Sequence, residues 1–136
     1  MHVRGKCHCG NIAFTAEINP DRVRICHCTD CQKLSGSPFR VVVPVSENKF
    51  NLLSGNLKHY IKVAESGDKR QQSFCPDCGT PIYATSVGDS NEPKKLGIRL
   101  GAIENGFEMV PKRQFWAASA VKWLGQISNV RSFDRQ

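Results

Sequence analysis

The stretch Cys26-His27-Cys28-Thr29-Asp30-Cys31 places three thiols within six residues of the chain. A turn this short can direct all three sulfurs toward one metal ion, and thiolates are ligands that Zn²⁺ prefers. Three protein ligands leave the fourth tetrahedral position open, which is typical of a catalytic zinc rather than of a structural one. We therefore predict an open, catalytic zinc site on Cys26, Cys28 and Cys31.

The other four cysteines form two closely spaced pairs, Cys7 with Cys9 and Cys75 with Cys78. A glycine directly follows each pair, and glycine allows the backbone to turn tightly around a metal. Together the two pairs supply the four thiolates of a closed, structural zinc site. The free energy of metal binding at such a site is folding free energy, because the site does not exist in the unfolded chain.

Other ligand arrangements fit the same sequence. Cys7 and Cys9 can join the central cluster and leave Cys75 and Cys78 elsewhere. A histidine can instead complete the central cluster as a closed site, the candidates being His8, His27 and His59. We favour four plus three, because the two glycine-flanked pairs match each other and the central triplet needs no distant ligand.

Short β-rich runs separated by turn residues predict a mainly-β domain of two small sheets. The expected strands span residues 11–18, 23–25, 39–45, 49–53, 57–63, 70–74, 80–87, 96–102 and the first half of 114–124. We expect the strands 49–53 and 57–63 to pair as a hairpin, because Ser-Gly-Asn lies between them.

Some single residues carry further structural expectations. Pro44 indicates an edge strand or a strand end, because proline cannot donate a backbone hydrogen bond. Thr29 or Asp30 is expected to cap a short helix that continues through residue 34. We expect Trp116 and Trp123 to be buried in the core, because large aromatic side chains bury the most area there.

The composition indicates one zinc-binding domain over residues 1–136, without a linker, a secretory signal or an apolar run long enough to cross a membrane. We therefore expect a cytoplasmic protein whose thiols are reduced and bind metal. The formal net charge of +7 becomes +4 if seven thiolates bind two Zn²⁺ ions. Its cations are scattered, so we expect no nucleic-acid partner; they suit either a small anionic ligand or a solvated surface.

Four ordered motifs, covering roughly residues 3 to 133, give the chain a family resemblance. It resembles the glutathione-dependent formaldehyde-activating enzyme (GFA) family, whose domain is shared with centromere protein V. The motifs are Cys7-x-Cys9-Gly10, Cys26-His27-Cys28-x-x-Cys31-Gln32 with Ser35-Gly36, Phe74-Cys75-x-x-Cys78-Gly79-Thr80, and Trp116-x-x-Ser119-x-x-x-Trp123.

The resemblance implies a mainly-β, Mss4-like (β-tent) fold of small antiparallel sheets stapled by the four-cysteine zinc site. It also implies a catalytic zinc on the central triplet and glutathione as the small-molecule partner. The activity named for the family is the condensation of formaldehyde with glutathione to S-(hydroxymethyl)glutathione, classed as a carbon–sulfur lyase. Where the family often carries a histidine before the tryptophan motif, this chain has Gln114.

Two functions follow as hypotheses. The first is a zinc-dependent carbon–sulfur lyase acting on a thiol–aldehyde adduct, because zinc can hold a thiol as the nucleophilic thiolate. Phe39 and Arg40, just after the central cluster, are expected to line its pocket. The alternative is a zinc-stabilised module that binds protein or nucleic acid without catalysis. The central zinc is expected to be labile, because a three-thiolate site can lose metal or oxidise.

Overall fold

The computed structural model describes residues 1–136 and consists of two β-sheets, one α-helix and short 3₁₀ turns. The smaller sheet has the strand order β1 (His2–Lys6), β2 (Ala13–Glu17), β5 (Phe50–Ser54). The larger has the order β10 (Arg113–Phe115), β3 (Arg24–Cys26), β4 (Arg40–Ser46), β9 (Lys95–Arg99), β8 (Pro81–Ser86), β7 (Lys69–Phe74), β6 (Lys58–Val63). The predicted mainly-β fold class is confirmed. All strand pairs are antiparallel except β10 with β3.

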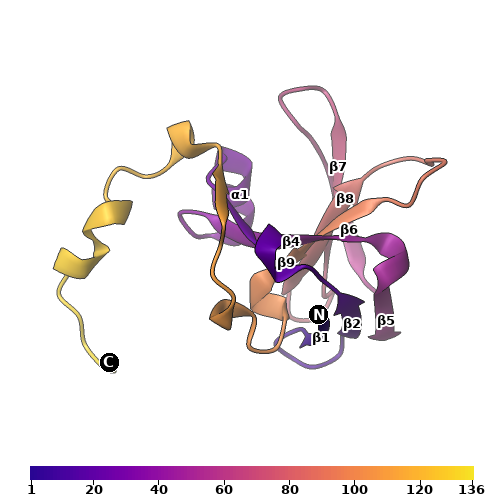
Figure 1. Ribbon diagram of the computed structural model, residues 1–136, viewed down its shortest axis with the longest axis horizontal. Helices are drawn as coiled ribbons and strands as arrows, with labels where there is room; N and C mark the ends of the chain where they lie inside the picture. Colours follow the sequence, from indigo (N-terminus) through magenta and orange to yellow (C-terminus); the bar gives the residue numbers. More distant parts are fainter.

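The helical elements are short and lie between strands or near the C-terminus. The only α-helix, α1, spans Thr29–Ser35 and follows β3 directly. The 3₁₀ turns are Pro20–Arg22, Glu47–Lys49, Leu100–Ala102, Gly106–Glu108, Ala117–Ser119 and Leu124–Asn129. Figure 1 shows the C-terminal segment, in yellow, extending away from both sheets. None of these helices has the length and apolar character needed to cross a membrane.

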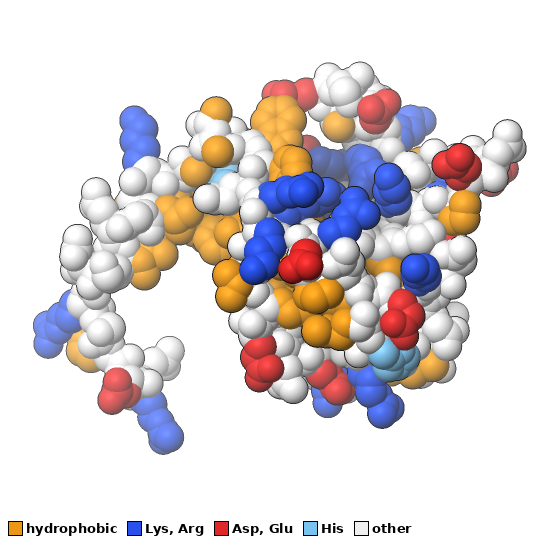
Figure 2. All heavy atoms as spheres, in the orientation of Figure 1, with side chains coloured by type: hydrophobic (Ala, Val, Ile, Leu, Met, Phe, Trp, Pro, Cys, Tyr) orange, Lys and Arg blue, Asp and Glu red, His pale blue; other side chains and the backbone are white.

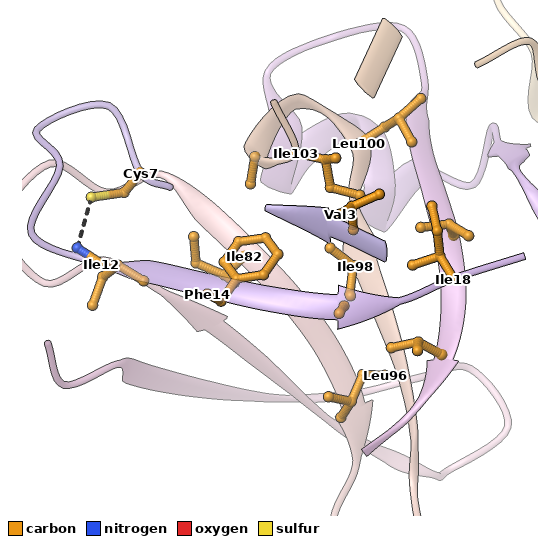
Figure 3. Packing of buried hydrophobic residues seen from close by; sticks show 14 of the residues in the cluster. Val3, Cys7, Ile12, Phe14, Ile18, Ile82, Leu96, Ile98, Leu100 and Ile103 are labelled. Atoms are coloured by element: carbon orange, nitrogen blue, oxygen red, sulfur yellow. Dashed lines mark hydrogen bonds between the residues drawn. The ribbon is translucent and has the colours of Figure 1, made fainter. Parts of the chain in front are cut away.

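The core lies between the smaller sheet and one face of the larger sheet. It contains sixteen buried residues, including Val3 of β1, Phe14 of β2, Ile82 of β8 and Ile98 of β9 (Figure 3). Their alternation along each strand follows from the two-residue period of β-structure, which sends successive side chains to opposite faces. The opposite face of the larger sheet therefore remains available for other side chains.

Gly5 of β1 is required by close packing rather than by an unusual backbone angle. A Cβ atom at this position would overlap the ring of Phe14 and lie 2.5 Å from the carbonyl oxygen of Ala102. Overpacking of a buried site typically costs 1–3 kcal/mol. We expect Gly5→Ala to lower the free energy of unfolding by about 1–3 kcal/mol in urea denaturation. Gly125→Ala is the matched control, since a Cβ there meets no atom within 4 Å; an equal loss in both variants would contradict the packing argument.

The predicted hairpin is wrong. β5 pairs with β2 in the smaller sheet, whereas β6 is the edge strand of the larger sheet. The end of β5 is tied to the chain before β2, because Ser54 Oγ donates a hydrogen bond to the carbonyl oxygen of Asn11 at 3.0 Å. The three linking residues thus carry the chain from one sheet to the other.

Two local expectations need correction, and a third holds in part. β4 is an internal strand, but Pro44 lies beyond residues 40–42 that pair with β3 and is paired only with Gly97 of β9, so the strand is locally an edge at this position. The N-cap of α1 is Cys28, not Thr29 or Asp30. The tryptophans are not core residues, since Trp116 is 59% and Trp123 is 52% exposed. Both belong to the segment that leaves the sheets, so the core is filled by aliphatic residues and Phe14.

Candidate metal centre

The structure brings together the sulfurs of Cys7, Cys9, Cys75 and Cys78, all within 4.8 Å of one another. The Sγ atoms of Cys7 and Cys9 are 3.5 Å apart, and those of Cys9 and Cys75 are 3.8 Å apart. Four sulfurs at about 2.3 Å from a tetrahedral zinc lie about 3.8 Å from each other. The four residues therefore fit a closed tetrathiolate site.

Two matching turns position these four thiols. The N–H of Gly10 donates to the carbonyl oxygen of Cys7 at 3.1 Å, and that of Gly79 donates to Cys75 at 2.9 Å. Both glycines have positive φ, +83° and +75°, which residues with a Cβ rarely adopt. The N–H of Ile12 points at Cys7 Sγ, 3.2 Å away (Figure 3), and such donors stabilise a thiolate.

The two turns are also bonded directly to each other. The N–H of His8 donates to Thr80 Oγ1 at 3.0 Å, and the Asn11 amide contacts the Asp77 carboxylate. β1 and β2 belong to the smaller sheet and β7 and β8 to the larger one, so this cluster joins the two sheets. A metal held here would cross-link residues nearly seventy positions apart in sequence.

The sulfurs of Cys26, Cys28 and Cys31 form a second group within 4.8 Å. Cys26 ends β3, Cys28 is the N-cap of α1, and Cys31 lies in its first turn. The Cys28 sulfur accepts a hydrogen bond from the Cys31 N–H at 3.3 Å, which fixes the start of the helix. All three residues are partly exposed, and no fourth ligand atom belongs to the group.

The histidines are engaged elsewhere. His27 is fully buried, its Nε2 lies 2.8 Å from Gln114 Oε1, and its ring packs edge-on against Phe39. His59 Nδ1 bonds Ser73 Oγ at 2.8 Å, and His8 is exposed outside both sulfur groups. The alternative of a histidine that closes the central site is therefore not supported. Gln114 acts as the partner of His27 and does not line the cavity described next.

A cavity of about 340 Å³ adjoins the central cysteines. Its floor is the face of the larger sheet that points away from the core, as the strand register shows. Phe115, Cys26 and Arg40 are partners across β10, β3 and β4, and Arg24, Val42 and Arg99 are partners across β3, β4 and β9. Cross-strand partners project from the same face of a sheet. Small residues further along this face, Gly97 and Ala84, leave the space open.

Five cations and no carboxylate line this cavity, which we call the basic basin; they are Arg24, Arg40, Lys62, Arg70 and Arg99. Figure 2 shows lysine and arginine side chains gathered in a hollow above β4 and β9, between α1 and β7. Lys62 alone has an acidic partner, the Asp30 carboxylate at 2.6 Å. The expectation that Arg40 lines the pocket is confirmed, whereas Phe39 lies against His27 instead.

The ionisation of the basin reflects burial and the crowding of like groups. Burial lowers the pKa of Arg99 to about 9, and the neighbouring charge of Arg40 contributes to the same shift. In the thiol cluster, a hydrogen bond from Cys31 lowers the pKa of Cys26 to about 5. The same contact raises the pKa of the Cys31 thiol above its ordinary value. One thiolate is thus already stabilised by its neighbours before any metal is considered.

Sequence reasoning missed most of the basin. Arg24, Arg70, Arg99 and Trp116 line it but gave no local signal, because they come from four separate segments. The available hint was the spacing of Arg24 and Cys26, two residues apart in one strand and hence on one face. To identify the other residues on that face one must know the order of the strands in the sheet, and the local sequence pattern does not give this order.

The fold and the two cysteine groups define a mainly-β protein with two candidate metal centres. Comparisons with known proteins identify its family. The model of the glutathione-dependent formaldehyde-activating enzyme family matches residues 2–119, so this chain belongs to that family. A crystal structure of a Rhodobacter sphaeroides protein shares the fold, with a TM-score of 0.62 and 19% identity over 82% of this chain and 98% of that one.

Two fungal proteins also match this chain, over a smaller share of its length. A Phaeosphaeria nodorum protein with the provisional name of a glutathione-dependent formaldehyde-activating enzyme is 30% identical over 86 residues, which is 61% of this chain and 44% of that protein. An uncharacterised lyase of Schizosaccharomyces pombe is 29% identical over 92 residues, 64% of this chain and 60% of that protein. The matches thus span less than two thirds of either relative.

Proposed function

We propose that this chain is a zinc-dependent carbon–sulfur lyase that condenses glutathione with formaldehyde to S-(hydroxymethyl)glutathione and catalyses the reverse cleavage. The observation that carries the proposal is the group of three sulfurs, within 4.8 Å of each other, at the wall of a cavity. The family description and the name of the lyase relative support the reaction class. We place the protein in the cytoplasm, because its seven cysteines are grouped as metal ligands, which requires them to stay reduced.

Cys26, Cys28 and Cys31 would hold the catalytic zinc, and Cys7, Cys9, Cys75 and Cys78 the structural one. A zinc ion held by these three thiolates would supply a site that binds an exogenous thiol and favours its ionised form. In the reaction the glutathione sulfur attacks the formaldehyde carbon. The C–S bond forms as the carbonyl π bond breaks, and the proton lost from the thiol ends on the new hydroxyl oxygen.

The chain itself orients the reactants around this cluster. Gln32, in α1, donates from Nε2 to the carbonyl oxygens of His27 and Ser119, both at 2.9 Å. These bonds tie the cysteine turn to the segment that carries Trp116, which lines the cavity. The cavity volume of about 340 Å³ suits a small ligand. The arginines have no acidic partner and therefore favour an anionic ligand. Glutathione carries a carboxylate at each end.

The test is the rate at which ¹³C-labelled carbon exchanges between free formaldehyde and its glutathione adduct, measured by NMR. We expect protein loaded with two zinc ions per chain to accelerate the exchange well above the spontaneous rate. Protein retaining only the structural zinc, and free Zn²⁺ at equal concentration, serve as controls. Exchange at the spontaneous rate with fully loaded protein would contradict the proposal and favour the zinc-stabilised binding module.

A further inference from the structure

The arginines of the basic basin lack the acidic partners that buried cations normally have. Arg40 is only 7% exposed, and its Nη1 donates to Gln72 Oε1 at 3.2 Å. Arg99 Nη2 donates to the same oxygen at 2.7 Å, while its buried Nε has no partner. Two guanidinium groups thus share one neutral oxygen. Because buried charge is costly unless it is paired, this arrangement indicates a missing anion.

The surroundings do not supply that anion. Asp30 is committed to Lys62, and no carboxylate lines the basin. Three thiolates with one Zn²⁺ carry a net charge of −1. Set against the five cations and Asp30, this leaves the basin with three positive charges. A bound anion that accepts charge-assisted hydrogen bonds would therefore be held more strongly here than a neutral ligand.

The position of the arginines relates this anion to the sulfur chemistry. Arg40 is the cross-strand partner of Cys26, and both project from the same face of the sheet. Arg99 lies one strand further along that face, where it pairs with Val42. A single small molecule in this cavity can therefore present its sulfur to the cysteines and a carboxylate to the guanidinium groups.

We propose that Arg40 and Arg99 bind a carboxylate of the thiol substrate, so that this protein selects small anionic thiols over neutral and cationic ones. The inference rests on the proposed function for its link to a thiol. The guanidinium groups are suited to this task because their planar N–H donors match the two oxygens of a carboxylate. Gln72 Oε1 accepts one N–H from each guanidinium group, which leaves their other donors for the incoming ligand.

The first test uses two thiols of nearly equal shape, N-acetylcysteine and its amide, which differ in one carboxylate. We expect kcat/KM for formaldehyde exchange to favour N-acetylcysteine by about tenfold or more, the value of a charged hydrogen bond. Arg99→Gln and Arg40→Gln should reduce this preference to about threefold or less, chiefly by weakening the reaction of N-acetylcysteine. The preference for the carboxylate should survive in Arg135→Gln, a control that removes the same charge from the exposed C-terminus.

Substitution of a buried arginine can also disturb the fold. Arg99→Lys addresses this, because it keeps the charge but loses the fork geometry, and we expect an intermediate preference. A merely structural role would lower kcat/KM for both thiols equally and leave their ratio unchanged. An unchanged ratio in both glutamine variants would overturn the proposal.

A second measurement separates this proposal from the lyase reaction. S-methylglutathione keeps both carboxylates but has no free thiol, so its binding can be followed by calorimetry without turnover. Binding to the wild type that is lost in Arg99→Gln would support the anion site even if no thiol shows accelerated exchange. Equal binding to both, or no binding to either, would overturn it. Inorganic phosphate that binds as tightly as S-methylglutathione would also overturn it, since the basin would then be a general anion site.

Discussion

Cys28→Ser is expected to abolish lyase activity while the protein stays folded. The substitution removes one of three thiolates from the central group, where no fourth ligand atom is available as a substitute. We expect the zinc content to fall from about two to about one per chain, and kcat/KM for formaldehyde exchange to fall by about a hundredfold or more. Elemental analysis and the exchange assay measure the two effects on the same sample.

Cys28 is chosen because its replacement by serine should leave the stability of the fold unchanged. Cys28 is the N-cap of α1, where its sulfur accepts the N–H of Cys31. Serine is among the best N-cap residues, so the hydroxyl can accept that bond and the helix remains capped. Lys33→Ser, an exposed change in the same helix, is the control for activity and thermal stability. Full activity in Cys28→Ser would show that the central cysteines are not the catalytic group.

Cys75→Ser is expected to unfold the protein. Cys75 is fully buried and belongs to the four-cysteine group that joins the two sheets. Structural zinc contributes on the order of 10 kcal/mol of folding free energy, comparable to the whole stability of an ordinary domain. Circular dichroism and one-dimensional NMR should therefore show lost β-structure and lost dispersion in the variant. A strong chelator should have the same effect on the wild-type protein.

Pro76→Ser is the matched control for this prediction. It places a serine in the same turn, at an exposed position, and leaves all four thiols in place. We expect it to unfold cooperatively within a few degrees of the wild type, because exposed substitutions rarely change stability by more than about 0.5 kcal/mol. A folded Cys75→Ser protein with its metal content unchanged would contradict the assignment of Cys75 as a structural ligand.

The two predictions separate the roles of chemically identical residues. Both cysteine groups have sulfurs within 4.8 Å of each other, but only one joins two sheets and only the other lines the basin. The structural group takes two pairs from distant strands, so its metal acts on folding. The central group comes from six consecutive residues, so losing its metal opens no long loop.

The sequence alone determined the features that depend on local spacing. The grouping of seven cysteines as four and three followed from glycine-flanked pairs and from one short turn, and the structure places the sulfurs in those two groups. The mainly-β class followed from short alternating runs, whose boundaries shift by only a residue or two in most strands. Such patterns are local because side-chain direction along a strand alternates with a fixed period.

Only the tertiary structure decided how those strands pair. The separation of β5 from β6 into different sheets could not be predicted, because a tight turn between two strands favours a hairpin on local grounds alone. The exposure of Trp116 and Trp123 likewise depends on a C-terminal segment that leaves the sheets. The basic basin depends on the order β3, β4, β9, which aligns Arg24, Arg40 and Arg99 on one face. Strand order is set by the burial of the whole core, and that is a property of no single stretch of sequence.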